Sequence, residues 1–180
     1  MRPQRGGRRE EATMSGSGNQ YDHLFVKHMP VCGPDDFNNE GEAADLEQPK
    51  NLGEPNWLLH AGLVPDAKVN MTHIWIHETE VPELWVVPHV HDYDEILIWT
   101  GGDPDNPHDL GAEIYMDIDG ERHTITTSGC VYIPAGVEHC PLGFTRVDRP
   151  FRFSALSLAP HYVSDREERA AERARAREAD

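Results

Sequence analysis

The sequence is poor in cysteine and in long apolar runs. Its three cysteines, Cys32, Cys130 and Cys140, are few and odd in number for 180 residues. Such a set is typical of reduced, partly buried thiols in a cytoplasm rather than of a disulfide framework. No apolar run approaches the roughly 18 residues that cross a bilayer, and residues 1–20 lack the apolar segment of a secretory signal. We therefore expect a cytoplasmic protein without a membrane partner.

Positive charge is also scarce. The chain has 32 acidic and 16 basic side chains, a formal net charge of -16 at pH 7. Residues 1–14 hold four arginines and two glutamates, residues 164–180 hold five arginines and six acids, and the 149 residues between them carry -17. This balance argues against broad binding to nucleic acid or to anionic lipid. We therefore expect no nucleic-acid partner.

Length and composition predict one domain with flanking segments. An apolar content of 38% in 180 residues is enough for one real core. The start is rich in Arg, Gly and Ser, either Met1 or Met14 is the true first residue, and the end is a run of Ala, Glu and Arg without an apolar stripe. The predicted parts are a disordered tail (1–20), an extension packing on the core (21–68), a strand-rich barrel (69–160) and a charged helical tail (161–180).

Short strands dominate from about residue 69. Residues 71–77 alternate, which places Met71, His73, Trp75 and His77 on one face of a strand. Asp119-Gly120 is a strong hairpin turn signal. Further strands are predicted at 84–90, 95–100, 112–118, 121–126, 130–133 and 151–158, and a short one at 21–26. Many short strands separated by turns predict an all-β sandwich or barrel.

The segment from Pro88 to Glu95 has the spacing of a metal site. In a strand, His89 and His91 lie on one side about 6.6 Å apart, so both imidazoles can reach one point. The polar residues 92–94 are turn-like, which brings the Glu95 carboxylate back beside the two rings. Two histidines and one carboxylate on one side leave coordination positions open for a substrate or for oxygen.

A second segment supplies a fourth candidate ligand. Pro134 and Gly136 turn the chain sharply after an apolar strand, and His139 follows where the chain returns to the sheet. In a barrel, the side chain of His139 can reach the same interior point as His89 and His91.

These residues resemble the two motifs of the cupin superfamily. The first motif is matched by His89, His91, Glu95 and Gly102, with Glu83 in place of its opening glycine. The second is matched by Pro134, Gly136 and His139, with Ser128 in place of a glycine and Gly143 in place of an asparagine. The resemblance covers residues 83–143, and its departures fall on turn and framework positions.

The resemblance implies a jelly-roll (double-stranded β-helix) barrel. It also implies that His89, His91, Glu95 and His139 bind one divalent ion of iron, manganese, nickel or zinc. The implied function is a mononuclear metalloenzyme in which the metal is a Lewis acid for a small oxygen-bearing metabolite. A dioxygenase, isomerase, decarboxylase or lyase fits the ligands equally well. The alternatives are a metal-dependent binding or sensing module without turnover and a structural scaffold, and a homodimer that exchanges residues 21–26 is a further expectation.

Weaker candidates surround this set. Tyr93 is a candidate acid or base, or simply a turn aromatic, and Arg146 is a candidate for gripping a substrate carboxylate, or a surface ion pair. Arg149 and Arg152, like Arg146, are candidates either for gripping a substrate carboxylate or for surface ion pairs. Residues 102–110 form either a lid or an ordinary loop. His73, Trp75 and His77 are candidates for lining the cavity, where the histidines could also support the metal ligands, or are ordinary wall and surface residues.

Overall fold

The computed structural model describes residues 19–32 and 48–160. The predicted helical tail at 161–180 and nearly all of the predicted disordered tail at 1–20 lie outside these ranges. The four-part division therefore stays a prediction, although residues 56–59 of the proposed extension form a strand within a sheet. In the described ranges, no helix is long and apolar enough to cross a membrane.

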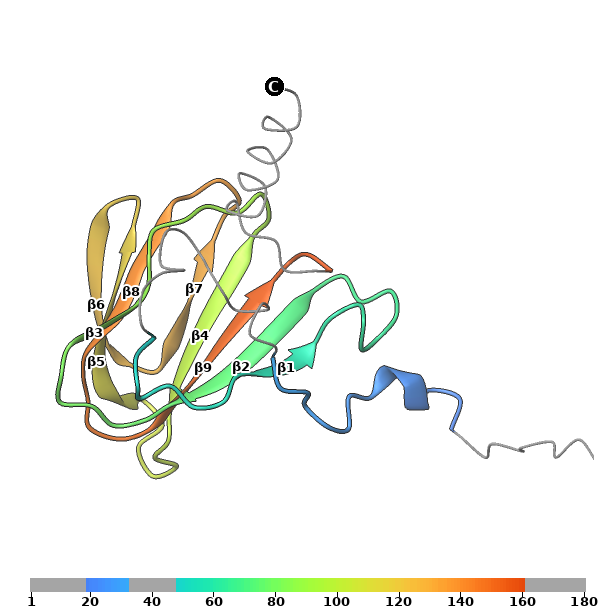
Figure 1. The fold of residues 1–180 in the computed structure, drawn as a ribbon, viewed down its shortest axis with the longest axis horizontal. Coiled ribbons are helices and arrows are strands. Elements are labelled where there is room, and N and C mark those ends of the chain that lie inside the picture. Colours follow the sequence, from blue (N-terminus) through green and yellow to red (C-terminus); the bar gives the residue numbers. More distant parts are fainter. Residues whose placement is uncertain (1–18, 33–47, 161–180) are drawn as a thin grey trace, which may run out of the picture.

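Two antiparallel sheets face each other (Figure 1). One has five strands in the order β1-β2-β9-β4-β7, and the other has four in the order β3-β8-β5-β6. The strands are β1 (Asn56–Leu59), β2 (Asn70–Ile76), β3 (Glu83–Val86), β4 (Glu95–Gly101), β5 (Asp109–Ile118), β6 (Glu121–Thr127), β7 (Gly129–Ile133), β8 (His139–Val147) and β9 (Phe151–Ser157). This architecture confirms the predicted all-β jelly-roll class.

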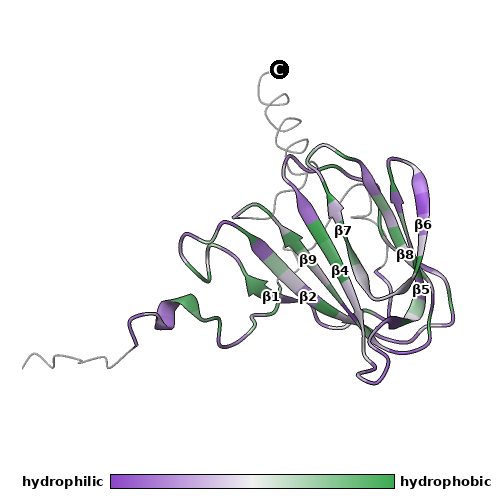
Figure 2. Ribbon diagram, turned by 180° about the vertical axis from the view of Figure 1, so that it is seen from behind, coloured by the Kyte–Doolittle hydropathy of each residue, from purple (hydrophilic) through white to green (hydrophobic). Residues whose placement is uncertain are grey.

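The core lies between the two sheets because the strands alternate in burial. Along β4, Leu97 and Trp99 are buried while Ile96 and Ile98 are only partly covered. The four-stranded sheet contributes residues such as Phe144 to the same core. Strand β6 is the hydrophilic edge, which Figure 2 shows in purple, and most of its residues are exposed. Each central strand thus has one face toward the core and one face away from it.

The Asp119-Gly120 hairpin is confirmed. The two residues connect β5 to β6 with φ of 48° and 78°. Positive φ at both central positions matches the right-handed twist of the flanking strands, and Gly adopts it at little cost. The predicted strand ends agree with the structure to within a few residues.

The predicted strand at residues 21–26 is wrong. Asp22–Leu24 form a 3-10 helix, η1, which extends away from the sheets (Figure 1). Leu24 is 51% exposed and Phe25 is 66% exposed. An apolar run becomes a strand only where another strand supplies hydrogen bonds, and η1 lies outside both sheets. The strand that this segment was expected to exchange in a homodimer is not formed in the chain.

Candidate metal site

Three parts of the chain bring four polar side chains together between the sheets. His89 and His91 lie in the segment after β3, Glu95 is the first residue of β4, and His139 is the first residue of β8. One ligand atom from each residue lies within 4.8 Å of the ligand atoms of the others. The exposed fractions are 4% for His89, 4% for His91, 2% for Glu95 and 1% for His139. We call these four residues the His3Glu cluster.

Main-chain hydrogen bonds place two of the histidines side by side. The amide of His89 donates to the carbonyl of His139, and the amide of His139 donates back, both at 3.1 Å. The two form an isolated antiparallel bridge, so their side chains lie directly opposite each other. Their ring centroids are 4.1 Å apart.

The two motif segments are also joined through the Pro134–Gly136 turn. The amide of Gly136, whose φ is 81°, donates to the carbonyl of His91 at 2.8 Å. The Asp94 carboxylate accepts hydrogen bonds from the Tyr132 hydroxyl and from the amide of Ala135. Both hydrogen bonds lower the pKa of Asp94, and the one from Tyr132 has the larger effect. The turn thus fixes the loop that carries His91 and precedes Glu95.

Hydrogen bonds to carbonyl groups select the tautomer of two imidazoles. The Nδ1 atom of His89 lies 2.9 Å from the carbonyl of Val87, and that of His139 lies 3.0 Å from the carbonyl of Val137. A carbonyl oxygen only accepts, so each Nδ1 carries the proton and donates. In the neutral ring, the lone pair is then on Nε2, which for His139 lies 3.4 Å from Glu95 Oε2. This is the tautomer that binds a metal through Nε2.

The Glu95 carboxylate has a different neighbour on each oxygen. Ser157 lies opposite Glu95 on β9, and its hydroxyl donates to Oε1 at 3.5 Å. Oε2 faces the imidazoles and lies 4.0 Å from Nε2 of His91. Sequence reasoning missed Ser157, since only the pairing register of β4 with β9 reveals it.

The chemistry of the His3Glu cluster fits one divalent ion. Imidazole nitrogens and a carboxylate oxygen suit first-row transition metals and zinc, which bind such atoms at about 2.0–2.2 Å. Two atoms on one ion are then separated by at most about 4.4 Å, so the four ligand atoms, within 4.8 Å of one another, would close in on a bound ion. Burial removes competing water from all four side chains. The cluster is therefore a possible metal site.

Comparison with known proteins finds similarity only among solved structures: no model of a protein family matches this chain, and no curated protein does. KdgF from Halomonas sp. is 10% identical with a TM-score of 0.40, covering 66% of this chain and 84% of that protein. A cupin-2 domain protein from Rhodospirillum rubrum is 9% identical with a TM-score of 0.43, covering 63% and 64%. An oxalate oxidase is 16% identical with a TM-score of 0.46, covering 82% and 64%. The similarity to these solved structures is one of fold alone.

Of the weaker candidates, Tyr93 lies beside the cluster and Arg146 lies away from it. The Tyr93 ring stacks on the His91 ring with centroids 4.7 Å apart and planes inclined by 14°. The Arg146 side chain is exposed on β8 and forms ion pairs with Asp148 at 3.0 Å and Glu113 at 3.4 Å. The surface ion pair, rather than a substrate contact, is thus what the structure shows for Arg146.

The structure corrects the placement of His73, Trp75 and His77. Strand β2 alternates as predicted, but its buried face carries Thr72, Ile74 and Ile76. His73 and Trp75 point to the outer face of the five-stranded sheet, and His77 is exposed just after the strand. They do not line the interior around the His3Glu cluster. Alternation separates two faces of a strand. The face that packs in the core of this protein is the one with the smaller, more apolar side chains, Thr72, Ile74 and Ile76.

Residues 102–108 join β4 to β5 at the far end of β4 from the His3Glu cluster. Glu95 begins β4 and Gly101 ends it, so the connection starts about 20 Å from Glu95. The lid interpretation of this segment therefore finds no support at the cluster.

Arg149 pairs with Asp109 at the start of β5. Cys140, next to His139, is buried.

Proposed function

We propose that the chain binds one divalent metal ion at the His3Glu cluster and is an enzyme acting on a small oxygen-bearing metabolite. The observation that carries the proposal is the convergence of three imidazoles and one carboxylate at a buried point, within 4.8 Å of one another. Buried titratable groups that gather at one point are candidates for a functional site.

Charge favours an anionic or chelating substrate. Three neutral imidazoles, one carboxylate and a divalent ion sum to a formal site charge of +1. In a buried site, that charge attracts a carboxylate, hydroxyl or carbonyl oxygen more strongly than it would in water. Hydroxy acids and keto acids combine these groups, and we propose them as the substrate class.

In the proposed site, the ion and the residues of the chain have different roles. A bound divalent ion supplies a Lewis acid that stabilises negative charge developing on a substrate oxygen. The Val87 and Val137 carbonyls hold two imidazoles in the binding tautomer, and Ser157 orients Glu95. The hydroxyl of Tyr93, whose ring stacks on His91, is the proposed acid or base. Isomerisation, decarboxylation, elimination and dioxygenation are all open to this arrangement.

Elemental analysis tests the metal site. We expect about one metal ion per purified chain, and a several-fold lower content in His91→Ala and in His139→Ala, since each variant removes one of four ligands. His123→Ala is the matched control because His123 is exposed on β6. Circular dichroism checks that each variant folds. Metal content unchanged in both ligand variants would show that the four residues form only a buried polar cluster.

A substrate screen tests the enzyme. The metal-loaded protein is incubated with a panel of hydroxy and keto acids while substrate loss and oxygen uptake are followed. Consumption that is lost in His139→Ala supports the proposal, and oxygen uptake separates a dioxygenase from the other classes. Stoichiometric metal with no consumption of any candidate favours a binding or sensing module.

A further inference from the structure

An open cavity lies on the outer face of the five-stranded sheet. Its volume is about 390 Å³, and it is lined in part by Ile98 of β4 and Ser154 of β9, which are cross-strand partners. The residues next to them in sequence, Leu97 and Phe153, point the other way into the core. The sheet therefore separates this cavity from the His3Glu cluster.

One lining residue, Arg152, brings a positive charge that no acid among the described residues pairs with. Residues 19–32 and 48–160 contain four arginines, and Arg122, Arg146 and Arg149 each pair with an aspartate. Within the same ranges, Arg152 has no carboxylate partner. Its guanidinium lies 5.7 Å from the centre of the Trp75 ring, on the same sheet face. In a chain with a net charge of -16, this is a selective place for an anion.

The other polar groups of the cavity are neutral. The Nδ1 atom of His73 lies 3.1 Å from the Ser154 hydroxyl. Burial and the neighbouring Arg152 charge lower the pKa of His73, so the ring is neutral at pH 7. Thr100 adds a second hydroxyl, and among the residues that the structure describes no carboxylate lines the cavity. The polar wall thus combines one cation with neutral hydrogen-bonding groups.

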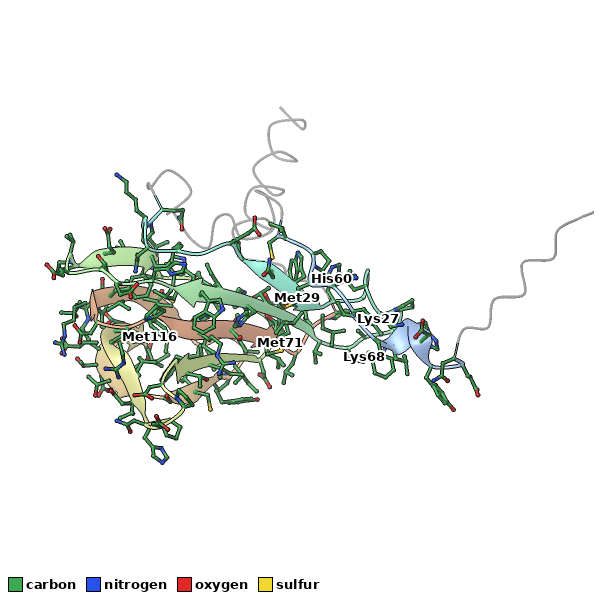
Figure 3. The ribbon with its side chains drawn as sticks, turned by 90° about the horizontal axis from the view of Figure 1, so that it is seen from below. Lys27, Met29, His60, Lys68, Met71 and Met116 are labelled. Atoms are coloured by element: carbon green, nitrogen blue, oxygen red, sulfur yellow. The ribbon has the colours of Figure 1, made fainter. Side chains whose placement is uncertain are left out.

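The remaining wall is apolar. Met29 reaches the cavity from the N-terminal segment, Leu58 from β1 and Ile98 from β4. Figure 3 labels Met29 where this segment passes the sheet, and hydrogen bonds of 2.9 Å from Trp57 to Pro30 and from Cys32 to Pro55 fix the segment against β1. The volume is near the lower end of small-molecule pockets, about 300–1,000 Å³. It suits a short apolar body joined to one anionic group.

We propose that this outer-face cavity binds a small organic carboxylate with an apolar body, independently of the metal site. A carboxylate accepts two parallel hydrogen bonds from a guanidinium. A single cation among neutral groups matches a monoanion better than a multiply charged phosphate. The apolar body lies against Met29, Leu58 and Ile98.

Titration with hexanoate and with phenylacetate tests this site. The protein is first treated with a chelator, which removes any binding of carboxylates to a metal in the His3Glu cluster. Calorimetry gives the affinity, and tryptophan emission reports on Trp75, which is 41% exposed. We expect dissociation constants on the order of 10⁻⁴–10⁻³ M for ligands of this size, and an emission change that disappears in Trp75→Phe.

Variants locate the binding. Arg152→Leu should weaken it about tenfold or more, since a charge-assisted pair is lost, and Arg152→Lys should weaken it less. Arg122→Leu is the matched control, because Arg122 is an exposed arginine on the other sheet. His91→Ala should bind as the wild type does. Hexan-1-ol has the apolar body without the carboxylate, and inorganic phosphate has negative charge without an apolar body. Both should bind more weakly than hexanoate.

Two results would overturn the proposal. They are equal affinity in the wild type and Arg152→Leu, and absence of binding by the chelated wild type at millimolar carboxylate. Thermal melting shows whether Arg152→Leu folds, and if it does not, the comparison uses Arg152→Lys and Thr100→Val. None of these results bears on whether the His3Glu cluster holds a metal, so the two proposals fail separately.

Discussion

At the scale of single residues, main-chain carbonyl groups decide how the imidazoles of the His3Glu cluster are presented. His89 and His139 each hydrogen-bond the carbonyl two residues earlier, through the same ring nitrogen. The contact therefore depends on the local path of the backbone rather than on the side chain of Val87 or Val137. Such support fixes ring orientation without adding a charged group beside the cluster.

An exposed ion pair gives a prediction at the same scale. Asp109 accepts hydrogen bonds from the Arg149 guanidinium and from the amide of Gly111. Both lower the pKa of Asp109, and the one from Arg149 has the larger effect. The folded pKa lies below the unfolded pKa, so the stabilisation is fully present above the unfolded pKa and is lost as pH falls through the folded one. Asp109→Asn should slightly lower Tm at pH 7, and the difference should shrink at acid pH.

Thermal melting of both proteins from pH 7 to pH 2 checks this expectation. Substitution at Asp109 leaves all other titrating groups in place, so the difference in Tm isolates the carboxylate. Because the pair is exposed, the effect should also decrease at high salt. A difference in Tm that is constant across the pH range would contradict the account.

At the scale of elements, Gly143 lies in β8 where a side chain would collide with both neighbouring strands. This residue pairs with Leu84 of β3 and with Tyr115 of β5. A Cβ atom at Gly143 would overlap with the carbonyl oxygen of Glu83 and with the Tyr115 hydroxyl. The strand that begins with His139 thus requires glycine at this position for its pairing on both sides.

Gly143→Ala should therefore destabilise the fold by about 1–3 kcal/mol, the usual cost of overpacking. Gly129→Ala is the matched control, also in a strand. There the nearest atom to an added Cβ, Trp99 Nε1, is at an ordinary 3.5 Å, so a change within about 0.5 kcal/mol is expected. Denaturant unfolding measures both. Equal stability of the two variants would show that β3 or Tyr115 shifts without cost.

Strand periodicity predicted the elements better than it predicted their environment. Most strands were expected to within a few residues, but β8 was expected only as the return of the chain after His139, since Pro141 and Gly143 interrupt its apolar pattern. Residues 21–26 showed the opposite error, because an apolar run alone does not supply a pairing strand. Partners and pairing register come from tertiary contacts that no local pattern contains.

The same distinction applies to the candidate site. The His-x-His spacing, the turn signals and the cupin resemblance together predicted that the four residues of the His3Glu cluster meet at one place, as they do in the structure. The contact of Ser157 with Glu95 depends on the register between β4 and β9, which lie 62 residues apart at this pair. His73 and Trp75 were assigned to the wrong side, because alternation shows that two faces exist without showing which is covered.

At the scale of the whole molecule, a metal bound between the sheets should stabilise the fold. An ion that binds only the folded state at about 100 times its dissociation constant adds about 2.7 kcal/mol. For a chain of this size, that raises Tm by about 5–10 °C. Prolonged treatment with a chelator should lower Tm by this amount, as measured by calorimetry, and re-addition of the metal should restore it.

His91→Ala serves as the control for this effect. Its Tm should be low at the outset and insensitive to the chelator, since the binding contribution is already lost. If the chelator lowered the Tm of the wild type and of His91→Ala equally, the ion would be bound elsewhere. A wild-type Tm unaffected by chelation would contradict metal stabilisation.

The two faces of β4 also determine which changes in chain length the molecule tolerates. Glu95 faces the interior and Ile98 faces the outer cavity, and every side chain between them takes its side from its position in the pleat. Insertion or deletion of one residue within β4 would reverse the sides of all residues beyond it, whereas a change of two would preserve them. The separation of the His3Glu cluster and the outer cavity onto opposite faces of β4 therefore depends on the length of this strand as well as on its composition.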